Sequence, residues 1–144
     1  MKKAWIWMVA ICLIASAGMY YYFQTNGPKI VKGSADLSES VDANGRPVDP
    51  SKSKSFSSKA KEIYVSVKFK RFISKGAKVR WYKGETLVEN RIKVDDNIKL
   101  SKSGYAYSKL TAPSEGFAPG DYSVILYAAG SDISETTIYF KIEQ

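Results

Sequence analysis

Apolar and polar residues alternate at every second position along much of the chain after residue 33. Residues 63–70 show the pattern most clearly, and residues 78–83 repeat it around Val79 and Trp81. A period of two is typical of a half-buried β-strand. The sequence therefore predicts two strands here, joined near residues 74–76. Trp81 is expected to anchor the core because a buried tryptophan removes about 150–250 Å² from water.

Further strands are predicted by the same alternation and by the turn-forming residues that separate the apolar stretches. No helical period occurs after residue 33, and the strand-rich part is about 111 residues long. Seven or eight short strands in that length predict an all-β fold, an immunoglobulin-like antiparallel β-sandwich over residues 34–144. The additional strands are expected at 34–41, 87–90, 105–110, 121–128 and 135–142, with turns at 42–47, 95–97 and 101–104 and loops at 48–61 and 111–120.

The N-terminal segment differs from the rest of the chain. Residues 4–23 carry no charge and follow Lys2 and Lys3. As a helix, 20 residues span roughly 30 Å, which is the thickness of the hydrocarbon layer of a membrane. Two tryptophans near its start and three tyrosines near its end match the aromatic belts of membrane spans. We therefore expect residues 1–23 to form a signal anchor, with the lysines in the cytoplasm and the domain outside.

Other export signals remain open for the same segment. Ala15–Ala17 has the small-x-small form of a signal-peptidase site, so residues 1–23 could instead contain a cleaved signal peptide. Lipidation of Cys12 is disfavoured by the bulky Ile11 before it, and a pilin-type segment is disfavoured by the absence of an acidic residue after a glycine. All these alternatives export the domain, and residues 24–33 read as a short linker.

The charge and the rare residues restrict the chemistry. The formal net charge is +8. Residues 63–110 hold twelve Lys or Arg against four Asp or Glu, whereas residues 111–144 hold one against five. There is no histidine, and Cys12 is the one cysteine. An intramolecular disulfide, a Cys/His metal site and a Ser–His or Cys–His pair are therefore excluded. We expect no enzyme activity, no metal and no cofactor.

A basic face is the first candidate site. Cationic side chains have the parity opposite to the apolar residues on the two strands at 63–70 and 78–83, and two tyrosines share that parity. If both strands belong to one sheet, these groups project together and suit phosphates, acidic polysaccharides or lipid head groups. The alternative is a solvated outer face of a basic protein. The candidate ligand-binding residues are Lys68, Lys70, Lys78, Arg80, Tyr64 and Tyr82.

Two further groups of residues are candidate sites. Asp95 and Asp96 are adjacent carboxylates, but a turn there is the expected setting, and the ligand spacing of a calcium loop is absent. Tyr105 and Tyr107 share a face of their predicted strand and could contribute to a binding surface. Tyrosines in such positions more often pair across strands and cover a sheet.

One resemblance supports the predicted fold. Residues 117–124, FAPGDYSV, followed by the strand at 139–142, resemble the last two strands of immunoglobulin-like and fibronectin-like modules. Tyr122 stands where such modules carry a corner tyrosine, and Trp81 resembles their core tryptophan. With residues 41–48, the chain is similar to a group of small exported bacterial immunoglobulin-like proteins over roughly residues 35–144. The matching residues belong to turns and core, so the resemblance implies a fold and no chemistry.

The sequence thus favours an extracytoplasmic, membrane-tethered module that binds without catalysis. The partner expected first is a protein or another component of the cell envelope, contacted through a sheet face or an edge strand. The alternative is an anionic polymer or lipid head groups bound through the basic face. The membrane is contacted through the N-terminal helix, and nucleic acid is not an expected partner.

Overall fold

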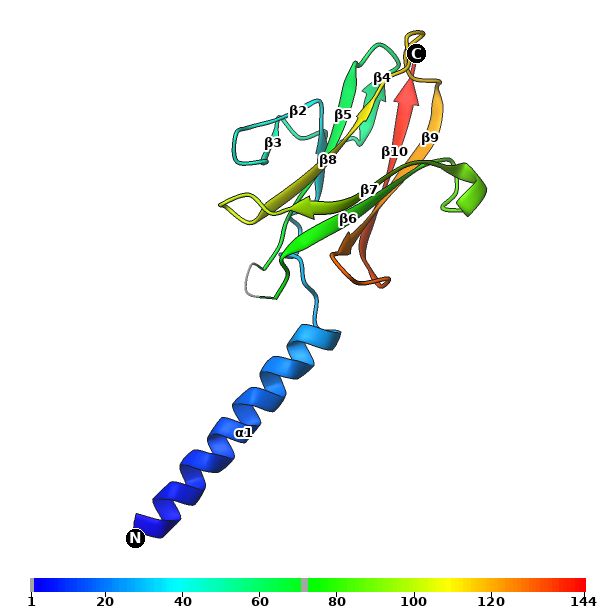
Figure 1. The fold of residues 1–144 in the computed structure, drawn as a ribbon. Coiled ribbons are helices and arrows are strands. Elements are labelled where there is room, and N and C mark those ends of the chain that lie inside the picture. Colours follow the sequence, from blue (N-terminus) through cyan, green and yellow to red (C-terminus); the bar gives the residue numbers. More distant parts are fainter. Residues whose placement is uncertain (1, 71–72) are drawn as a thin grey trace.

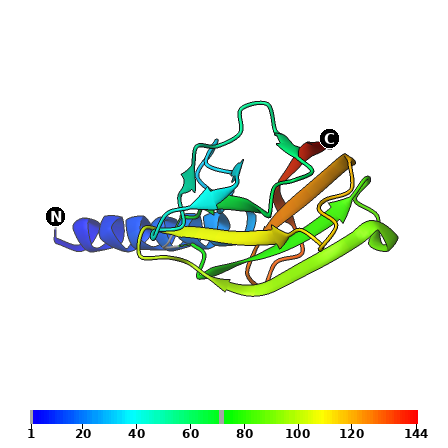
Figure 2. The same cartoon turned by 90° about the horizontal axis from the view of Figure 1, so that it is seen from above.

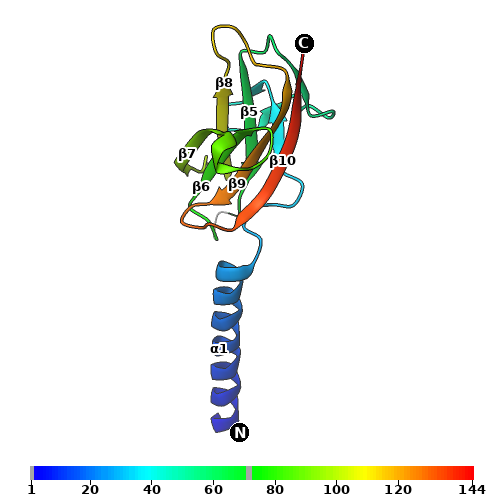
Figure 3. The ribbon, with the colours of Figure 1, turned by 90° about the vertical axis from the view of Figure 1, so that its right-hand side faces the viewer.

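A computed structural model describes residues 2–70 and 73–144. Helix α1 comes first, and the strands that follow form one β-rich domain (Figure 1). The helix projects away from the domain, and the C-terminus lies at the end opposite to it (Figure 3). The bounds are α1 Lys2–Asn26, β1 Asp36–Ser38, β2 Ser40–Val41, β3 Pro47–Val48, β4 Ser55–Ser57, β5 Glu62–Lys68, β6 Gly76–Lys83, the 3₁₀ helix η1 Val88–Asn90, β7 Arg91–Lys99, β8 Tyr105–Thr111, β9 Gly120–Ala128 and β10 Ser134–Glu143.

The strands form three sheets. A three-stranded sheet has the order β1-β5-β8, a five-stranded sheet has the order β4-β10-β9-β6-β7, and β2 and β3 form a separate hairpin. Neighbours are antiparallel except β4, which runs parallel to β10. The view from above shows the strands of the domain with α1 extending away from them (Figure 2). The prediction of a mostly β domain after one apolar helix is confirmed, while an immunoglobulin-like assignment is not.

One hydrophobic core joins the three-stranded and the five-stranded sheet. Alternate residues of β5, β6, β8, β9 and β10 point into it, as the sequence pattern predicted. Trp81 is fully buried, and its indole Nε1 donates a hydrogen bond to Ser108 Oγ at 2.8 Å, from β6 to β8 of the other sheet. The core includes Leu37, Ile63, Val65, Val67, Ala106 and Leu110 from the three-stranded sheet, and Val79, Trp81, Val124, Leu126, Ile138, Phe140 and Ile142 from the five-stranded sheet.

Three local predictions were wrong. The turn expected at residues 95–97 is part of β7, which runs through it with Asn97 at φ +58°. The acidic residues there suggested a turn from the sequence. In the structure Asp95 faces β8 and accepts a hydrogen bond from Ser108. The strand expected at 87–90 is largely the 3₁₀ helix η1. The first strand, expected over 34–41, is divided into β1 and β2.

Helix α1 does not pack against the domain. Its apolar stretch Ala4–Phe23 is long and apolar enough to cross a membrane, and none of it is buried by protein. A core helix of a water-soluble fold would be covered, so this segment fits either a membrane span or a signal sequence.

Part of the predicted linker at residues 24–33 is helical, and part is hydrogen-bonded to the domain. The helix continues to Asn26, and the chain joins the three-stranded sheet almost at once. Lys29 accepts a backbone hydrogen bond from Lys70 at 2.9 Å, and Val31 donates one to Lys68 at 2.8 Å. The Lys29 N–H also donates to the carboxylate of Glu135 at 2.9 Å. Only Gly27 and Pro28 therefore separate the helix from the first residue bonded to the domain.

Candidate functional site

The six predicted binding residues do not form one face. Tyr64 and Lys68 lie on β5 in the three-stranded sheet, whereas the three candidates on β6 lie in the five-stranded sheet. Lys70 follows the end of β5. The alternation on each strand was correct, but β5 pairs with β1 and β8 while β6 pairs with β7 and β9. Because the two sheets pack core to core, their outer faces point in opposite directions. The expected single basic face is thus two separate surfaces.

On β5, Tyr64 belongs to a polar cluster on the outer face of the three-stranded sheet. Its hydroxyl donates to the Glu62 carboxylate at 2.6 Å, and Lys109 Nζ on β8 contacts the same carboxylate at 2.6 Å. The hydrogen bond from Lys109, with that from Tyr64, lowers the pKa of Glu62, and the pKa values of Tyr64 and Lys109 are raised in turn. The Tyr64 ring also lies 6.2 Å from the ring of Tyr107. These side chains cover the sheet, as tyrosine pairs commonly do.

This cluster predicts a pH dependence. A carboxyl with a depressed folded-state pKa contributes stability that is present above its unfolded pKa and is lost as the pH falls through the folded value. In a ¹³C NMR titration, we expect the midpoint of Glu62 to lie below that of an unperturbed glutamate. The Lys109→Gln variant should move this midpoint upward, because it removes the largest cause of the shift. A midpoint unchanged by the substitution would show that the Lys109 contact does not persist in solution.

On β6, two cations lie over one aromatic ring. Lys78 Nζ is 5.0 Å and the Arg80 guanidinium is 4.9 Å from the ring centre of Tyr127, distances at which cation–π attraction operates. Lys78 also pairs with Asp132 at 2.9 Å and lowers the pKa of that carboxyl. Tyr82 is buried, so it offers little surface to a ligand. This surface is a compact cation–aromatic cluster, with much of its charge already in contact with protein.

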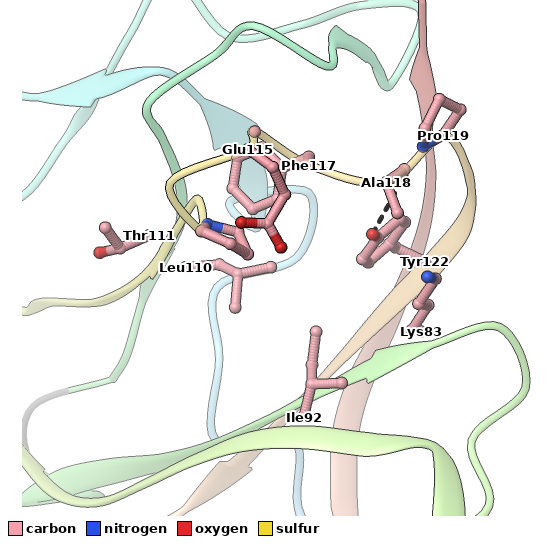
Figure 4. A pocket seen from close by; sticks show the side chains of 11 residues that line it. Lys83, Ile92, Leu110, Thr111, Glu115, Phe117, Ala118, Pro119 and Tyr122 are labelled. Atoms are coloured by element: carbon pink, nitrogen blue, oxygen red, sulfur yellow. Dashed lines mark hydrogen bonds between the residues drawn. The ribbon is translucent and has the colours of Figure 1, made fainter.

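A hollow that the sequence did not predict lies at the end of the domain remote from α1. It has a volume of about 520 Å³ and opens between β7, β8 and the β8–β9 loop (Figure 4). We call it the distal pocket. Its apolar wall includes Ile92, which is 47% exposed, and the core residues Leu110 and Phe117. Lys83 contributes one positive charge to the lining of the pocket, and Glu115 contributes one negative charge.

The β8–β9 loop that borders the distal pocket is fixed by hydrogen bonds. The Tyr122 hydroxyl donates to the Ala118 carbonyl at 2.9 Å, so this side chain bonds back to the backbone four residues upstream (Figure 4). The Phe117 N–H donates to the Ser58 carbonyl at 3.0 Å, and the Gly116 N–H donates to that of Pro113 at 2.9 Å. The loop reads in sequence as a Pro/Gly-rich connection. Its one aromatic residue, Phe117, was the available sign that it folds onto the core.

The candidate carboxylates take structural positions. Asp95 pairs with Lys93 at 2.9 Å and accepts from Ser108, which in turn accepts from Trp81. Asp96 has the opposite parity on β7 and is exposed. Within residues 2–70 and 73–144, no group of three or more His, Cys, Asp or Glu side chains is placed to hold a metal ion. The two aspartates point to opposite sides of β7 and do not face one site together.

Comparison with known proteins gives limited information. No family model matches the chain, and none of the curated proteins does. Among solved structures, the chain is similar to the soluble domain of PmoD from Methylocystis sp. ATCC 49242 (Rockwell), with 9% identity and a TM-score of 0.44. The alignment covers 82% of this chain and 99% of that one. A likeness at this level carries no conclusion about function.

Proposed function

We propose that this chain is a membrane-anchored, extracytoplasmic binding module without catalytic activity, and that its distal pocket receives an apolar segment of a protein in the cell envelope. The observation that carries the proposal is the position of the pocket. It lies at the end of the domain opposite to α1, where an anchored domain faces away from the membrane. Binding sites are typically concave and mostly apolar, with a few polar groups, and the distal pocket has this character.

The composition of the pocket fits a protein segment. Leu110 and Phe117 lie at its base with little exposure, and Ile92 stands half-exposed at its side. A partner side chain inserted there would cover Ile92 and extend the hydrophobic core. Lys83 and Glu115 can fix the orientation of a polar backbone or side chain at the rim. The pKa of Glu115 is lowered by its own backbone N–H and by Ser114, because both hydrogen bonds favour the charged carboxylate.

The architecture supports an immunoglobulin-like sandwich as the scaffold of this module. Two sheets, β1-β5-β8 and β4-β10-β9-β6-β7, enclose one core with a central tryptophan. Tyr122 bonds back to the backbone four residues upstream, as the corner tyrosine of such folds does. In immunoglobulin-like domains the loops gather at the two ends of the sandwich, and these ends are used for recognition. The distal pocket lies at one such end.

The anchor makes a direct prediction. If residues 4–23 span the membrane, the full chain should stay in the membrane fraction after extraction at alkaline pH, and its mass should include the N-terminal segment. Extraction of this kind releases peripheral proteins but leaves helices that cross the bilayer in place. A soluble chain that begins at Gly18 would show cleavage after Ala17. That result would retain export but overturn the anchor.

The binding proposal is tested by photo-crosslinking of the full chain in its native membrane. Benzoylphenylalanine is placed at Ile92 or Thr111, which line the distal pocket, and at Tyr107 as a control. Tyr107 is 45% exposed, close to the 47% of Ile92, but lies on the outer face of the three-stranded sheet. We expect both pocket positions to give an adduct with the same protein and the control position to give none.

A second step separates contact from function. The protein identified in the adduct is purified, and its binding to the full chain in lipid nanodiscs is compared with its binding to an Ile92→Glu variant. A charge in an apolar interface should weaken binding strongly, because it would be buried without a partner. Equal adducts at Tyr107, or equal binding by Ile92→Glu, would contradict the proposed pocket.

A second candidate function is the binding of anionic polymers or lipid head groups. The cations of the basic face predicted from the sequence are divided between two sheets. An extended polymer would therefore have to bridge opposite faces of the domain to contact all of them. A different grouping of lysines, at the end of the domain next to α1, favours lipid head groups.

A further inference from the structure

We propose that the end of the domain next to α1 is a docking surface for the anionic phospholipid head groups of the membrane that holds the helix. The proposal rests on the anchoring proposed above but not on the distal pocket. The lysines that carry it come from several connections at this end of the domain, and neither β5 nor β6 forms this surface alone.

The strand register brings four connections together at this end. The linker at 29–34 bonds to the end of β5. Gly76 at the start of β6 pairs with Lys99 at the end of β7, and Ala77 pairs with Ala128 at the end of β9. Tyr105 at the start of β8 pairs with Lys68. The linker, the β5–β6 and β7–β8 connections and the β9–β10 turn therefore share one surface, which we call the proximal end.

The proximal end is strongly basic. Among its described residues, the lysines clearly outnumber the acidic residues, and Lys78 forms an ion pair with Asp132. Lys32, Lys75 and Lys99 are exposed. Ile133 is 71% exposed, so the surface also carries an apolar side chain of the kind that enters the head-group region. The lysines are Lys29, Lys32, Lys68, Lys70, Lys75, Lys78, Lys99 and Lys102, and the acids are Asp36, Asp132 and Glu135.

The short connection keeps this surface close to the bilayer. The apolar stretch ends at Phe23, and three more helical residues rise about 4–5 Å above it. From Asn26 to Lys29 the chain can extend by at most about 11 Å. The head-group layer on each side of a bilayer is about 5–8 Å thick. The point where the chain joins the domain therefore lies within roughly 10 Å of the lipid phosphates, which is about one Debye length at physiological salt.

Charge attraction at this distance has a predictable size. A lysine near an anionic surface contributes about a fivefold preference for the docked state. Removing three exposed lysines should therefore reduce the ratio of docked to undocked domains by more than tenfold. The effect should also weaken as salt rises, because the Debye length falls to about 3 Å at 1 M.

The test uses the full chain with Cys12→Ala, reconstituted in nanodiscs and spin-labelled at Ile133→Cys. Nanodiscs of pure phosphatidylcholine are compared with nanodiscs that contain phosphatidylglycerol, and the accessibility of the label to a water-soluble nickel chelate is measured. We expect the label to be protected only with the anionic lipid, and exposed again in 1 M salt. The triple variant Lys32→Gln, Lys75→Gln, Lys99→Gln should lose the protection.

The matched control is Lys59→Gln, Lys61→Gln, Lys141→Gln, which removes the same charge from exposed positions near the opposite end. It should keep the protection, and circular dichroism should show unchanged strand content in both variants. Equal exposure of the label in the two lipids, or equal loss in both variants, would overturn the proposal while leaving the anchor intact. A chain that does not co-purify with the nanodiscs would overturn the anchor and this proposal together.

Discussion

Replacing Trp81 with alanine is expected to lower the free energy of unfolding of the domain by about 3–5 kcal/mol. The side chain is fully buried on β6, and its ring meets Phe140 edge-on at 6.0 Å. Its Nε1 hydrogen bond to Ser108 reaches the other sheet, so the substitution removes both packing and a link between the layers. Because small domains are stable by only about 5–15 kcal/mol, the variant should be close to unfolding.

Urea unfolding of the full chain in nanodiscs, followed by circular dichroism, measures this change. Two variants separate its causes. Trp81→Phe keeps most of the apolar contact but leaves Ser108 without its donor, and we expect a loss of about 1–3 kcal/mol from the hydrogen bond and the smaller ring. Tyr107→Ala, next to Ser108 but on the outer face, should cost far less. A loss for Trp81→Ala no greater than the small loss expected for Tyr107→Ala would mean that the core does not depend on the tryptophan.

Gly116→Ala is expected to have the second-largest effect, a loss of at least about 1–3 kcal/mol. Gly116 has φ +88°, a conformation that favours glycine, and an added Cβ would lie 2.7 Å from the backbone oxygen of Ser58. That oxygen also accepts the hydrogen bond from Phe117. The substitution should therefore displace the β8–β9 loop and deform the distal pocket, in addition to lowering stability.

Gly130→Ala is the matched control for this prediction. Gly130 has φ +73°, similar to Gly116, but nothing lies within 4 Å of an added Cβ. The control carries the backbone strain without the collision, so the difference between the two urea midpoints reports the contact with Ser58. If Gly130→Ala were as destabilising as Gly116→Ala, the tight packing of the loop on Ser58 would be disproved.

The long strands were predictable because their signal is local. In β8 and β10 the side chains alternate between core and solvent, so the residue pattern shows these strands directly. In β9 the apolar residues from Tyr122 to Ala128 are all buried, which also marks a strand. The path of β7 was not predictable in the same way. Asp95 accepts a hydrogen bond from Ser108 of β8, a partner that only the folded chain brings near. From the sequence alone, the polar residues around Asp95 therefore suggest a turn.

The candidate surfaces show the same limit. The parity of Lys68 and Arg80 was correct on each strand, but parity does not say which strands share a sheet. The proximal end unites lysines from connections that are far apart in sequence, and the distal pocket unites Ile92 of β7 with Phe117 of the β8–β9 loop. Such groupings depend on topology, which the period of a single strand does not contain.

The place of β10 in the five-stranded sheet has a consequence for the order of events in the cell. This last strand lies between β4 and β9 and supplies Ile138, Phe140 and Ile142 to the core. Helix α1 is synthesised about 120 residues before the end of β10, which is roughly 6–24 s earlier at ordinary rates of synthesis. The core therefore cannot close until the residues up to Ile142 have been synthesised. A chain captured by its N-terminal helix would cross the membrane unfolded and fold on the far side.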